Sequence, residues 1–211
     1  MSTTSSLASK RIESLLDESS FVEIGALVTA RATDFNLKQT ETPSDGVVTG
    51  YGVIDGNLVY VYSQDASVLN GSVGEMHAKK IANLYDLAMK TGAPVIGLVD
   101  SAGLRLQEAT DALNAFGEIY LKQTLASGVI PQITAIFGSC GGGLALMPTL
   151  TDFTFMEEKD GKLSINSACK MCRLCVKKGP EGAVEYVEDT ARPSVNKEEW
   201  KGADTGSINA R

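Results

Sequence analysis

The sequence predicts an α/β fold in which helices pack on a mostly parallel sheet. Two continuous apolar runs, residues 95–99 and 133–137, have the character of strands that are buried on both faces. One segment with apolar residues at helical spacing precedes the first run, and another lies between the two. Strands and helices that alternate in this way are typical of parallel strands joined by crossover helices.

The first part of the chain is expected to form a helix, a strand or extended arm, a polar loop, a β-hairpin and a second helix. Two Val- and Tyr-rich runs on either side of Asp55-Gly56-Asn57 indicate the hairpin. Helical spacing that ends before Gly92 and Pro94 indicates the second helix. In chain order these elements cover residues 6–17, 21–30, 40–45, 47–54 with 58–63, and 76–90.

The second part is expected to continue this alternation and then to change in character. The strand at 95–99 is followed by a helix over 106–125, the strand at 133–137, and a glycine-rich turn at 138–143 that opens a helix near 144–147. After Phe155 come a charged linker, a cysteine run, a β-prone piece at 183–187 and a polar tail. The sequence therefore predicts two domains, residues 1–160 and 161–211.

Composition is that of a soluble globular protein. The 211 residues are 43% hydrophobic and 21% charged, and the net charge of −7 argues against nucleic-acid binding, for which a basic face is expected. No apolar run reaches transmembrane length, and the first residues are polar without an apolar signal core. We therefore expect a cytoplasmic protein.

Two glycine-containing turns follow the buried strands. The first is Asp100-Ser101-Ala102-Gly103, and the second is the run GSCGGG at 138–143. Glycine permits positive φ and lets the backbone approach a ligand closely. Two such turns side by side can hold an oxyanion on their backbone N–H groups, as acyl chemistry requires. The alternative is that the glycines only allow tight packing of helices on the sheet.

Several ordered motifs carry a resemblance to a known family. They read GSVGE at 71–75, HAKKI at 77–81, DSAGLRLQE at 100–108, GSCGGG at 138–143 and TDF at 151–153. This pattern resembles the carboxyltransferase family, the β-type subunits of biotin-dependent acyl-CoA carboxylases and the related acyl-CoA decarboxylases. The resemblance runs from about residue 7 to about 162 and implies a crotonase-like β-β-α superhelix for residues 1–160.

The resemblance also implies a reaction and its donors. Carboxybiotin, borne by a biotin carboxyl carrier protein, gives up CO2, which an acyl-CoA enolate captures. Backbone amides stabilise the enolate oxygen, and in this sequence they belong to Ala102, Gly103, Gly141 and Gly142. The acyl group and the direction, carboxylation or decarboxylation, are left open.

Three cationic residues are candidates for contacts with the phosphates of CoA. Lys79, Lys80 and Arg105 lie within the family motifs, and their charge suits the task. The alternative, a solvated helix face, applies to at least one of the lysines. His77, the only histidine, is expected to be structural rather than a general base, and Cys140 a small buried residue rather than a nucleophile.

Departures from the family pattern bear on activity. Asn70 and Ala102 stand where related sequences usually have glycine, and Ala102 would resist positive φ. A second crotonase-like domain, with which the family forms its catalytic interface, is not found in these residues. Carboxyltransferase activity is therefore expected only after assembly with that half. We expect other carboxylase subunits as partners, and self-association through exposed apolar surface.

The cysteine run predicts a different chemistry. Cys169, Cys172 and Cys175 match the bacterial ferredoxin spacing for a 4Fe-4S cluster, except that Gly179 replaces the fourth cysteine before Pro180. Residues 161–202 resemble the extension of some electron-transfer flavoprotein α subunits, which implies a small α+β ferredoxin-like tail. Two alternatives to a carboxyltransferase domain follow: an iron–sulfur electron-transfer module fused to an acyl-CoA-binding scaffold, and a non-catalytic remnant.

Overall fold

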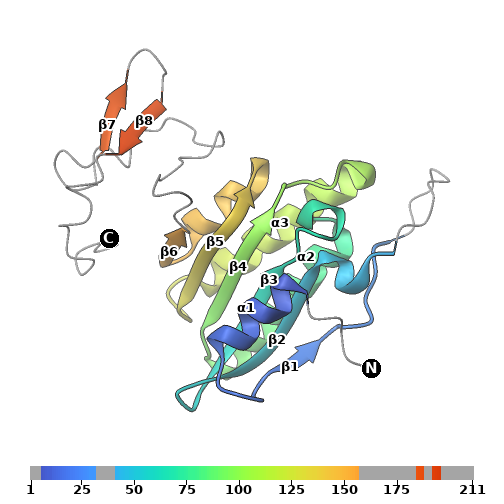
Figure 1. Cartoon of the computed structure of the whole chain (residues 1–211), viewed down its shortest axis with the longest axis vertical. Helices are drawn as coiled ribbons and strands as arrows, with labels where there is room; N and C mark the ends of the chain where they lie inside the picture. The colour runs from blue at the N-terminus through green and yellow to red at the C-terminus, as the bar shows by residue number, and fades with distance from the viewer. Residues whose placement is uncertain (1–5, 32–40, 157–183, 188–191, 196–211) are drawn as a thin grey trace. The chain divides into compact units, whose positions relative to one another are not determined.

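The computed structural model describes residues 6–31, 41–156, 184–187 and 192–195 (Figure 1). The chain divides into two compact units, Met1–Glu157 and Glu158–Arg211, and each is considered by itself. Among the described helices, none combines the length and the apolar character that crossing a membrane requires.

The first unit is built on a six-stranded sheet in which the strands lie in chain order. β1, β2 and β3 pair antiparallel, whereas β3, β4, β5 and β6 pair parallel. The predicted α/β class is confirmed, with a sheet that is mixed rather than mostly parallel. The strands are β1 (Val22–Ile24), β2 (Val47–Ile54), β3 (Asn57–Gln64), β4 (Val95–Ser101), β5 (Gln132–Cys140) and β6 (Phe153–Met156).

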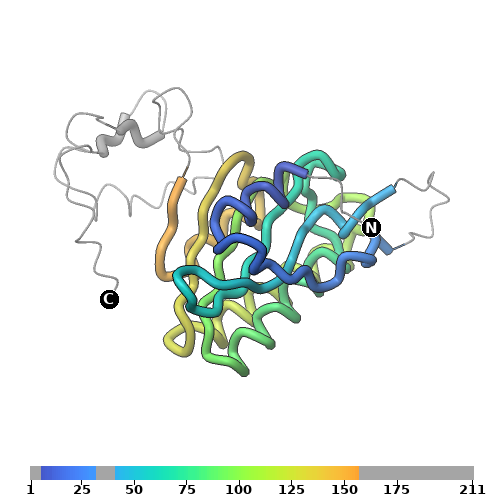
Figure 2. Tube along the Cα trace, turned by 60° about the horizontal axis from the view of Figure 1, so that its bottom comes forward, coloured from blue at the N-terminus to red at the C-terminus, as the bar shows by residue number. Residues whose placement is uncertain are grey.

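Helices cover both faces of this sheet (Figures 1 and 2). α1 (Leu7–Leu15) packs on one face through Ala8 and Ile12, against the side chains of β2, β3 and β4 that point to that side. α2 (Glu75–Thr91) and α3 (Ala109–Ala126) form the layer on the opposite face, where the larger core lies. Because successive side chains of a strand point to opposite faces, both cores draw on the same strands.

The element boundaries follow from local sequence. The hydroxyl oxygen of Ser6 accepts the N–H of Ser9 and caps α1, and Gly92 ends α2 in the left-handed conformation with φ of 72°. Asp55 and Gly56 both have positive φ, as a two-residue hairpin turn between β2 and β3 requires. The hairpin and α2 were predicted from these residues, and both predictions are confirmed.

Other predictions were only partly right. The helix expected over 106–125 is a 3-10 turn (Leu106–Glu108) followed by α3, because the backbone breaks at Ala109 with φ of 45°. The loop expected at 40–45 includes a 3-10 turn (Pro43–Gly46). β5 continues beyond 137 as far as Cys140, so the second glycine turn begins later than predicted, with a 3-10 helix over Gly142–Leu146.

Two of the strands, β6 and β8 (Arg192–Val195), were not predicted. β6 pairs with β5 at the edge of the main sheet, and all four of its residues are exposed. In the second unit β7 (Val184–Val187) matches the expected β-prone piece and pairs antiparallel with β8 (Arg192–Val195). β8 lies in the segment that was expected to be a polar tail, and its Pro193 gives no strand signal.

Candidate functional site

The two glycine turns lie in direct contact, at the ends of the neighbouring parallel strands β4 and β5. A Cβ added to Gly103 would lie 2.6 Å from the carbonyl oxygen of Gly141, and one added to Gly141 would lie 2.9 Å from that of Ala102. Gly103 also has φ of 105°, which side chains rarely tolerate. The glycines are therefore required for the turns to touch.

The backbone N–H groups of the four predicted donors are not equivalent. Ala102 N donates to Asn70 O (3.0 Å), Gly103 N to Ser101 Oγ (3.1 Å) and Gly141 N to Ser101 O (3.4 Å). Gly142 N has no acceptor among the described residues. The structure thus leaves one of the four predicted amides open.

Gly143 was not among the predicted donors, yet its N–H also lacks an acceptor among the described residues. Gly142 and Gly143 begin a 3-10 helix, so their N–H groups have no intrahelical partner, and both residues are exposed. The hydroxyl of Tyr120 on α3 donates to Gly143 O (2.5 Å) and ties this helix to α3. The run of three glycines was the available signal for Gly143, whereas nothing in the sequence pointed to Tyr120.

The structure accommodates both departures from the family pattern, Asn70 and Ala102. Ala102 does not have positive φ, so the expected conflict with its Cβ does not arise. Asn70 has φ of 55°, a value that asparagine tolerates better than most residues. The Asn70 carbonyl accepts the Ala102 N–H, which fixes the first turn.

Arg105 lies inside the fold rather than at the surface. Its side chain is 2% exposed, and Nη1 forms ion pairs with Asp45 Oδ1 (2.6 Å) and Glu108 Oε1 (2.9 Å). Nη2 donates to Ser72 O (2.7 Å). Because its guanidinium is buried and bonded within the fold, the placement of Arg105 does not favour the predicted contact with a CoA phosphate.

The same two carboxylates cap the N-terminus of α2. Glu108 Oε2 accepts the N–H of Glu75 (2.6 Å), and Asp45 Oδ2 accepts the N–H of His77 (2.7 Å). Negative charge is favourable at this end of a helix. Burial raises the pKa of Asp45, and the neighbouring Arg105 opposes that rise. Residues 71–81 therefore form the start of α2, and Asp45 and Glu108, which lie outside this motif, hold it in place.

The two predicted lysines have different surroundings. Lys80 is buried, its Nζ donates to Ser44 O (3.0 Å) and Val47 O (2.5 Å), and burial lowers its pKa to about 8. Lys79 lies on the exposed side of α2 and pairs with Glu75 (2.5 Å). Of the three predicted cations, Lys79 is the one that faces solvent.

His77 is structural, as expected. It is fully buried, with Nδ1 2.9 Å from Asp45 O and Nε2 3.1 Å from Gln64 Nε2. Burial lowers its pKa to about 3, and the positive charge of Arg105 adds to the effect. The ring is neutral at physiological pH and has no access to a ligand.

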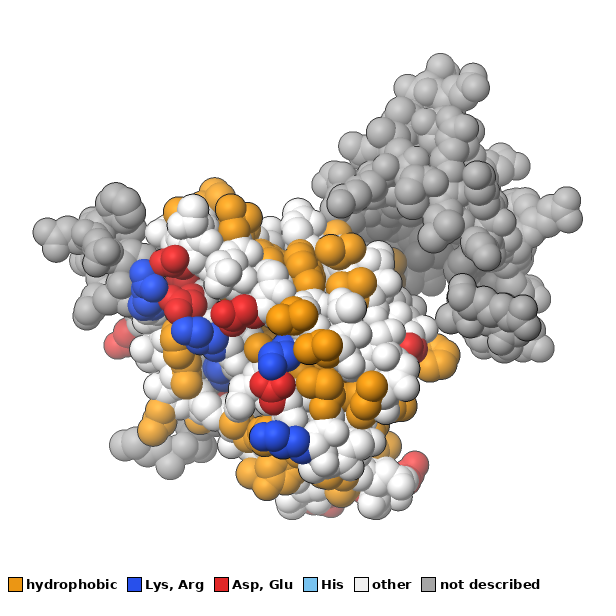
Figure 3. Space-filling view, turned by 180° about the vertical axis from the view of Figure 1, so that it is seen from behind, with side chains coloured by type: hydrophobic (Ala, Val, Ile, Leu, Met, Phe, Trp, Pro, Cys, Tyr) orange, Lys and Arg blue, Asp and Glu red, His pale blue; other side chains and the backbone are white. Residues whose placement is uncertain are grey.

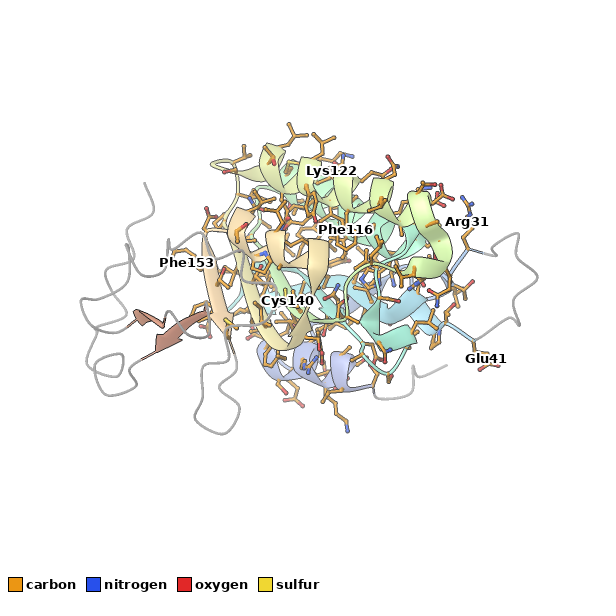
Figure 4. All side chains as sticks on the ribbon, turned by 90° about the horizontal axis from the view of Figure 1, so that it is seen from above. Arg31, Glu41, Phe116, Lys122, Cys140 and Phe153 are labelled. Carbon is orange, nitrogen blue, oxygen red and sulfur yellow. The ribbon has the colours of Figure 1, made fainter. Side chains whose placement is uncertain are left out.

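Cys140 is also buried, and burial raises the pKa of its thiol to about 11. Cys140 and Phe116 belong to the same buried cluster, and Figure 4 labels both between Arg31 and Phe153, which lie towards opposite edges of the view. Cys169, Cys172 and Cys175 lie outside the described residues. Within the described part of the chain, no group of His, Cys, Asp and Glu is arranged to hold a metal ion.

The outer face of α3 is notably apolar. Leu113, Leu121 and Leu125 are each more than half exposed, and Val129 follows them just beyond the helix. Figure 3 shows apolar side chains gathered on the face that α2 and α3 cover, with charged side chains beside and between them. An apolar patch of this kind is typical of a protein–protein contact.

Comparison with known sequences identifies the family. The sequence profile of the carboxyl transferase domain matches residues 2–176, most of the chain. The chain belongs to the carboxyl transferase domain family. The match extends past the boundary predicted at residue 160.

Two curated relatives show how similar this chain is to other proteins with a carboxyl transferase domain. It is 50% identical over 158 residues to the methylmalonyl-CoA decarboxylase subunit alpha of Propionigenium modestum, covering 75% of this chain and 31% of the relative. It is 44% identical over 198 residues to the propionyl-CoA carboxylase beta chain of Roseobacter denitrificans, covering 94% and 36%. The chain thus spans about a third of the length of these relatives.

Solved structures agree with this assignment. The transcarboxylase 12S hexamer, described with methylmalonyl-coenzyme A and methylmalonic acid bound, has a TM-score of 0.70 and 42% identity, over 72% of this chain and 30% of the other. A Pseudomonas malonate decarboxylase hetero-tetramer in complex with malonate has a TM-score of 0.65 and 26% identity, over 72% and 58%. Both likenesses support the crotonase-like class that the motifs implied.

Proposed function

We propose that this chain is the acyl-CoA-binding carboxyltransferase part of a biotin-dependent acyl-CoA carboxylase or decarboxylase. The observation that carries the proposal is the contact between two glycine turns, one of which presents the N–H groups of Gly142 and Gly143 without acceptors among the described residues. Family membership supplies the reaction class. Such N–H groups suit a thioester oxygen on which negative charge develops.

The turns would stabilise an enolate without a side-chain nucleophile. Gly142 and Gly143 supply donors from the second turn, and Gly103 can supply one from the first if the Ser101 hydroxyl turns away from it. Carboxybiotin on a partner protein would donate CO2 to the enolate, and in the opposite direction uncarboxylated biotin would accept the CO2 that the acyl-CoA releases. His77 takes no part, because its ring is buried and both nitrogens have partners.

For CoA, we propose Lys79 as the cation that meets the phosphates. Lys79 is exposed on α2, whereas Lys80 and Arg105 are buried and bonded within the fold. The ion pair with Glu75 competes with this contact, so we expect Lys79 to contribute modestly.

We propose that the complete reaction needs more than these residues. The chain spans about a third of its curated relatives, and the transcarboxylase 12S structure is a hexamer. We therefore propose a biotin carboxyl carrier protein, other carboxylase subunits and further copies of this chain as partners, in the cytoplasm. The apolar face of α3 supports such assembly.

The iron–sulfur alternative has weaker support. Cys169, Cys172 and Cys175 provide three thiolates, and a 4Fe-4S cluster takes four. The remaining cysteine, Cys140, is buried with its pKa raised to about 11, which opposes its use as a thiolate ligand. The cysteine run therefore supplies three thiolates for four positions, and the cluster stays a prediction from spacing. Stoichiometric iron and acid-labile sulfide in anaerobically purified protein would favour it.

The carboxyltransferase proposal is tested by the carbon-13 signal of propionyl-CoA labelled at its thioester carbonyl. We expect saturable binding and a downfield shift of this signal, because hydrogen bonds polarise the carbonyl. Gly142→Ala should reduce the shift, since φ at this position is 57° and the added Cβ strains the turn. Gly56→Ala is the matched control, with φ of 76° and the same open surroundings but a position in the β2–β3 hairpin.

The outcomes separate the parts of the proposal. No binding of propionyl-CoA by the wild-type chain would overturn acyl-CoA binding by this chain. Binding with equal carbonyl shifts in wild type, Gly142→Ala and Gly56→Ala would overturn the assignment of the second turn as donor.

A further inference from the structure

A single carboxylate joins both glycine turns to α1. Asp100 begins the first turn, and its Oδ1 accepts the N–H of Ser139 (3.3 Å), two residues before Gly141 in the second turn. Its Oδ2 accepts a hydrogen bond from Arg11 Nη2 on α1 (3.0 Å). Three segments that are distant in the sequence therefore meet at one side chain.

The backbone of β5 bulges around this carboxylate. Val99 pairs with Ile136 and Ser101 with Cys140, so the register advances by two residues on β4 and by four on β5. The N–H of Ser139 inside the bulge points to Asp100. Bulges of this kind redirect a strand end and are frequent beside active sites.

Gly138 provides the space for the carboxylate. A Cβ added to Gly138 would lie 2.0 Å from Asp100 Oδ1, so a larger residue cannot occupy this position while Asp100 keeps its place. The glycine of the second turn and the aspartate of the first are thus fitted to each other.

The carboxylate is itself held firmly. The Arg11 and Asp100 side chains are only 12% and 14% exposed, so water screens their ion pair weakly. The Arg11 guanidinium also lies 4.8 Å from the centre of the Phe137 ring. On the backbone side, Asp100 N donates to Gln64 Oε1 (3.2 Å).

We propose that Asp100 is a positioning residue that sets the spacing of the two glycine turns, with Arg11 fixing its carboxylate. It acts through the backbone of residues 139–143, and so determines where the open amides of Gly142 and Gly143 point. The importance of that direction for catalysis rests on the proposed function. A purely structural ion pair, by contrast, would secure α1 and leave the turn amides unchanged.

Asp100→Asn separates these two roles. An amide has one acceptor oxygen, and charge-assisted bonds are the stronger, so the Asn oxygen should turn to Arg11. The N–H of Ser139 then faces an NH2 group and loses its acceptor. Asp86→Asn is the matched control, because Asp86 also pairs with a cation, Lys122 (2.6 Å), but joins α2 to α3.

The primary measurement is the amide spectrum of nitrogen-15-labelled protein. We expect Asp100→Asn to shift the amide signals of Gly141, Gly142 and Gly143 and to speed hydrogen exchange at Ser139 about tenfold or more. Asp86→Asn should leave these signals in place. Unchanged signals of residues 141–143 in folded Asp100→Asn would overturn the proposal.

Two further measurements keep the test decisive. Ser139 is an exposed residue, so slow exchange of its amide in the wild type is expected only if Asp100 holds it, and free exchange would overturn the proposal even if the variant failed to fold. With labelled propionyl-CoA, Asp100→Asn should lose more of the carbonyl shift than of the affinity. Failure of the wild type to bind propionyl-CoA would count against the proposed function alone, since the amide signals judge Asp100 independently.

Discussion

The first unit is expected to lose stability as pH falls, because the buried ring of His77 resists the proton that the unfolded chain binds. The Asp45 carbonyl can only accept, so Nδ1 of His77 carries the proton, and Nε2 accepts from the side-chain NH2 of Gln64. The Gln64 orientation is fixed in turn by its Oε1, which accepts Asp100 N–H. A second proton on the ring would face the NH2 of Gln64 in a site without water access.

The magnitude follows from the pKa. Burial lowers the pKa of His77 to about 3 in the folded protein, from an unfolded value of 6.5. Between these values the unfolded chain binds a proton that the folded chain does not. The stabilisation is therefore complete above the unfolded pKa and is lost as pH falls towards the folded one. Linkage gives a loss of about 2 kcal/mol between pH 7 and pH 5.

Urea unfolding followed by circular dichroism at pH 7, 6 and 5 measures this loss, with His77→Gln as the comparison. Carboxylates contribute to the pH dependence of both proteins. The difference between wild type and variant in the slope of unfolding free energy against pH therefore isolates the contribution of His77. Equal slopes in wild type and His77→Gln would refute the reasoning. If the variant does not fold, the proton signals of the wild-type ring should show no titration down to pH 5, and a titration near pH 6.5 would contradict the low pKa.

Three other substitutions test the site. Gly103→Ala should lower the free energy of unfolding in urea by about 2–4 kcal/mol, because strain at positive φ adds to a collision with the backbone. Gly56→Ala, in open surroundings, should lower it by only about 1 kcal/mol, and equal losses would contradict the tight contact of the turns. Arg105→Met should cost about 3–5 kcal/mol by leaving two buried carboxylates unpaired, and a neutral result would show that the buried pair is not required. Lys79→Ala should leave unfolding unchanged and weaken propionyl-CoA binding in calorimetry, more so at low salt; unchanged affinity would remove Lys79 from the proposed CoA contact.

Sequence patterns predicted the central elements because these depend on local residues. The hairpin follows from turn chemistry at Asp55 and Gly56, and α2 from apolar spacing that ends at Gly92. The contact of the two glycine turns could also be expected, since the ends of neighbouring parallel strands meet at one edge. The hairpin and α2 need no knowledge of distant partners, and the contact of the turns needs only the pairing of β4 with β5.

The burial and the partners of the charged residues could not be predicted in the same way. Arg105 and Lys80 look like surface cations in the sequence, and only the fold shows that Asp45 and the carbonyls of 44 and 47 surround them. The extension of β5 to Cys140 depends on a bulge filled by Asp100, a side chain on another strand. Each of these outcomes is decided by contacts across the sequence, which local patterns do not contain.

The buried ion cluster around Arg105 also bears on how the chain folds. Arg105 and Asp45 are 60 positions apart, and the charges leave water only when the loop after β4 docks on the segment before β2. Such a step belongs late in folding, because desolvated charges are stabilised only once their partners are in place. Loss of the cluster should therefore accelerate unfolding while leaving the folding rate nearly unchanged. In stopped-flow measurements on Arg105→Met, a slowed folding limb would instead place the cluster in the folding nucleus.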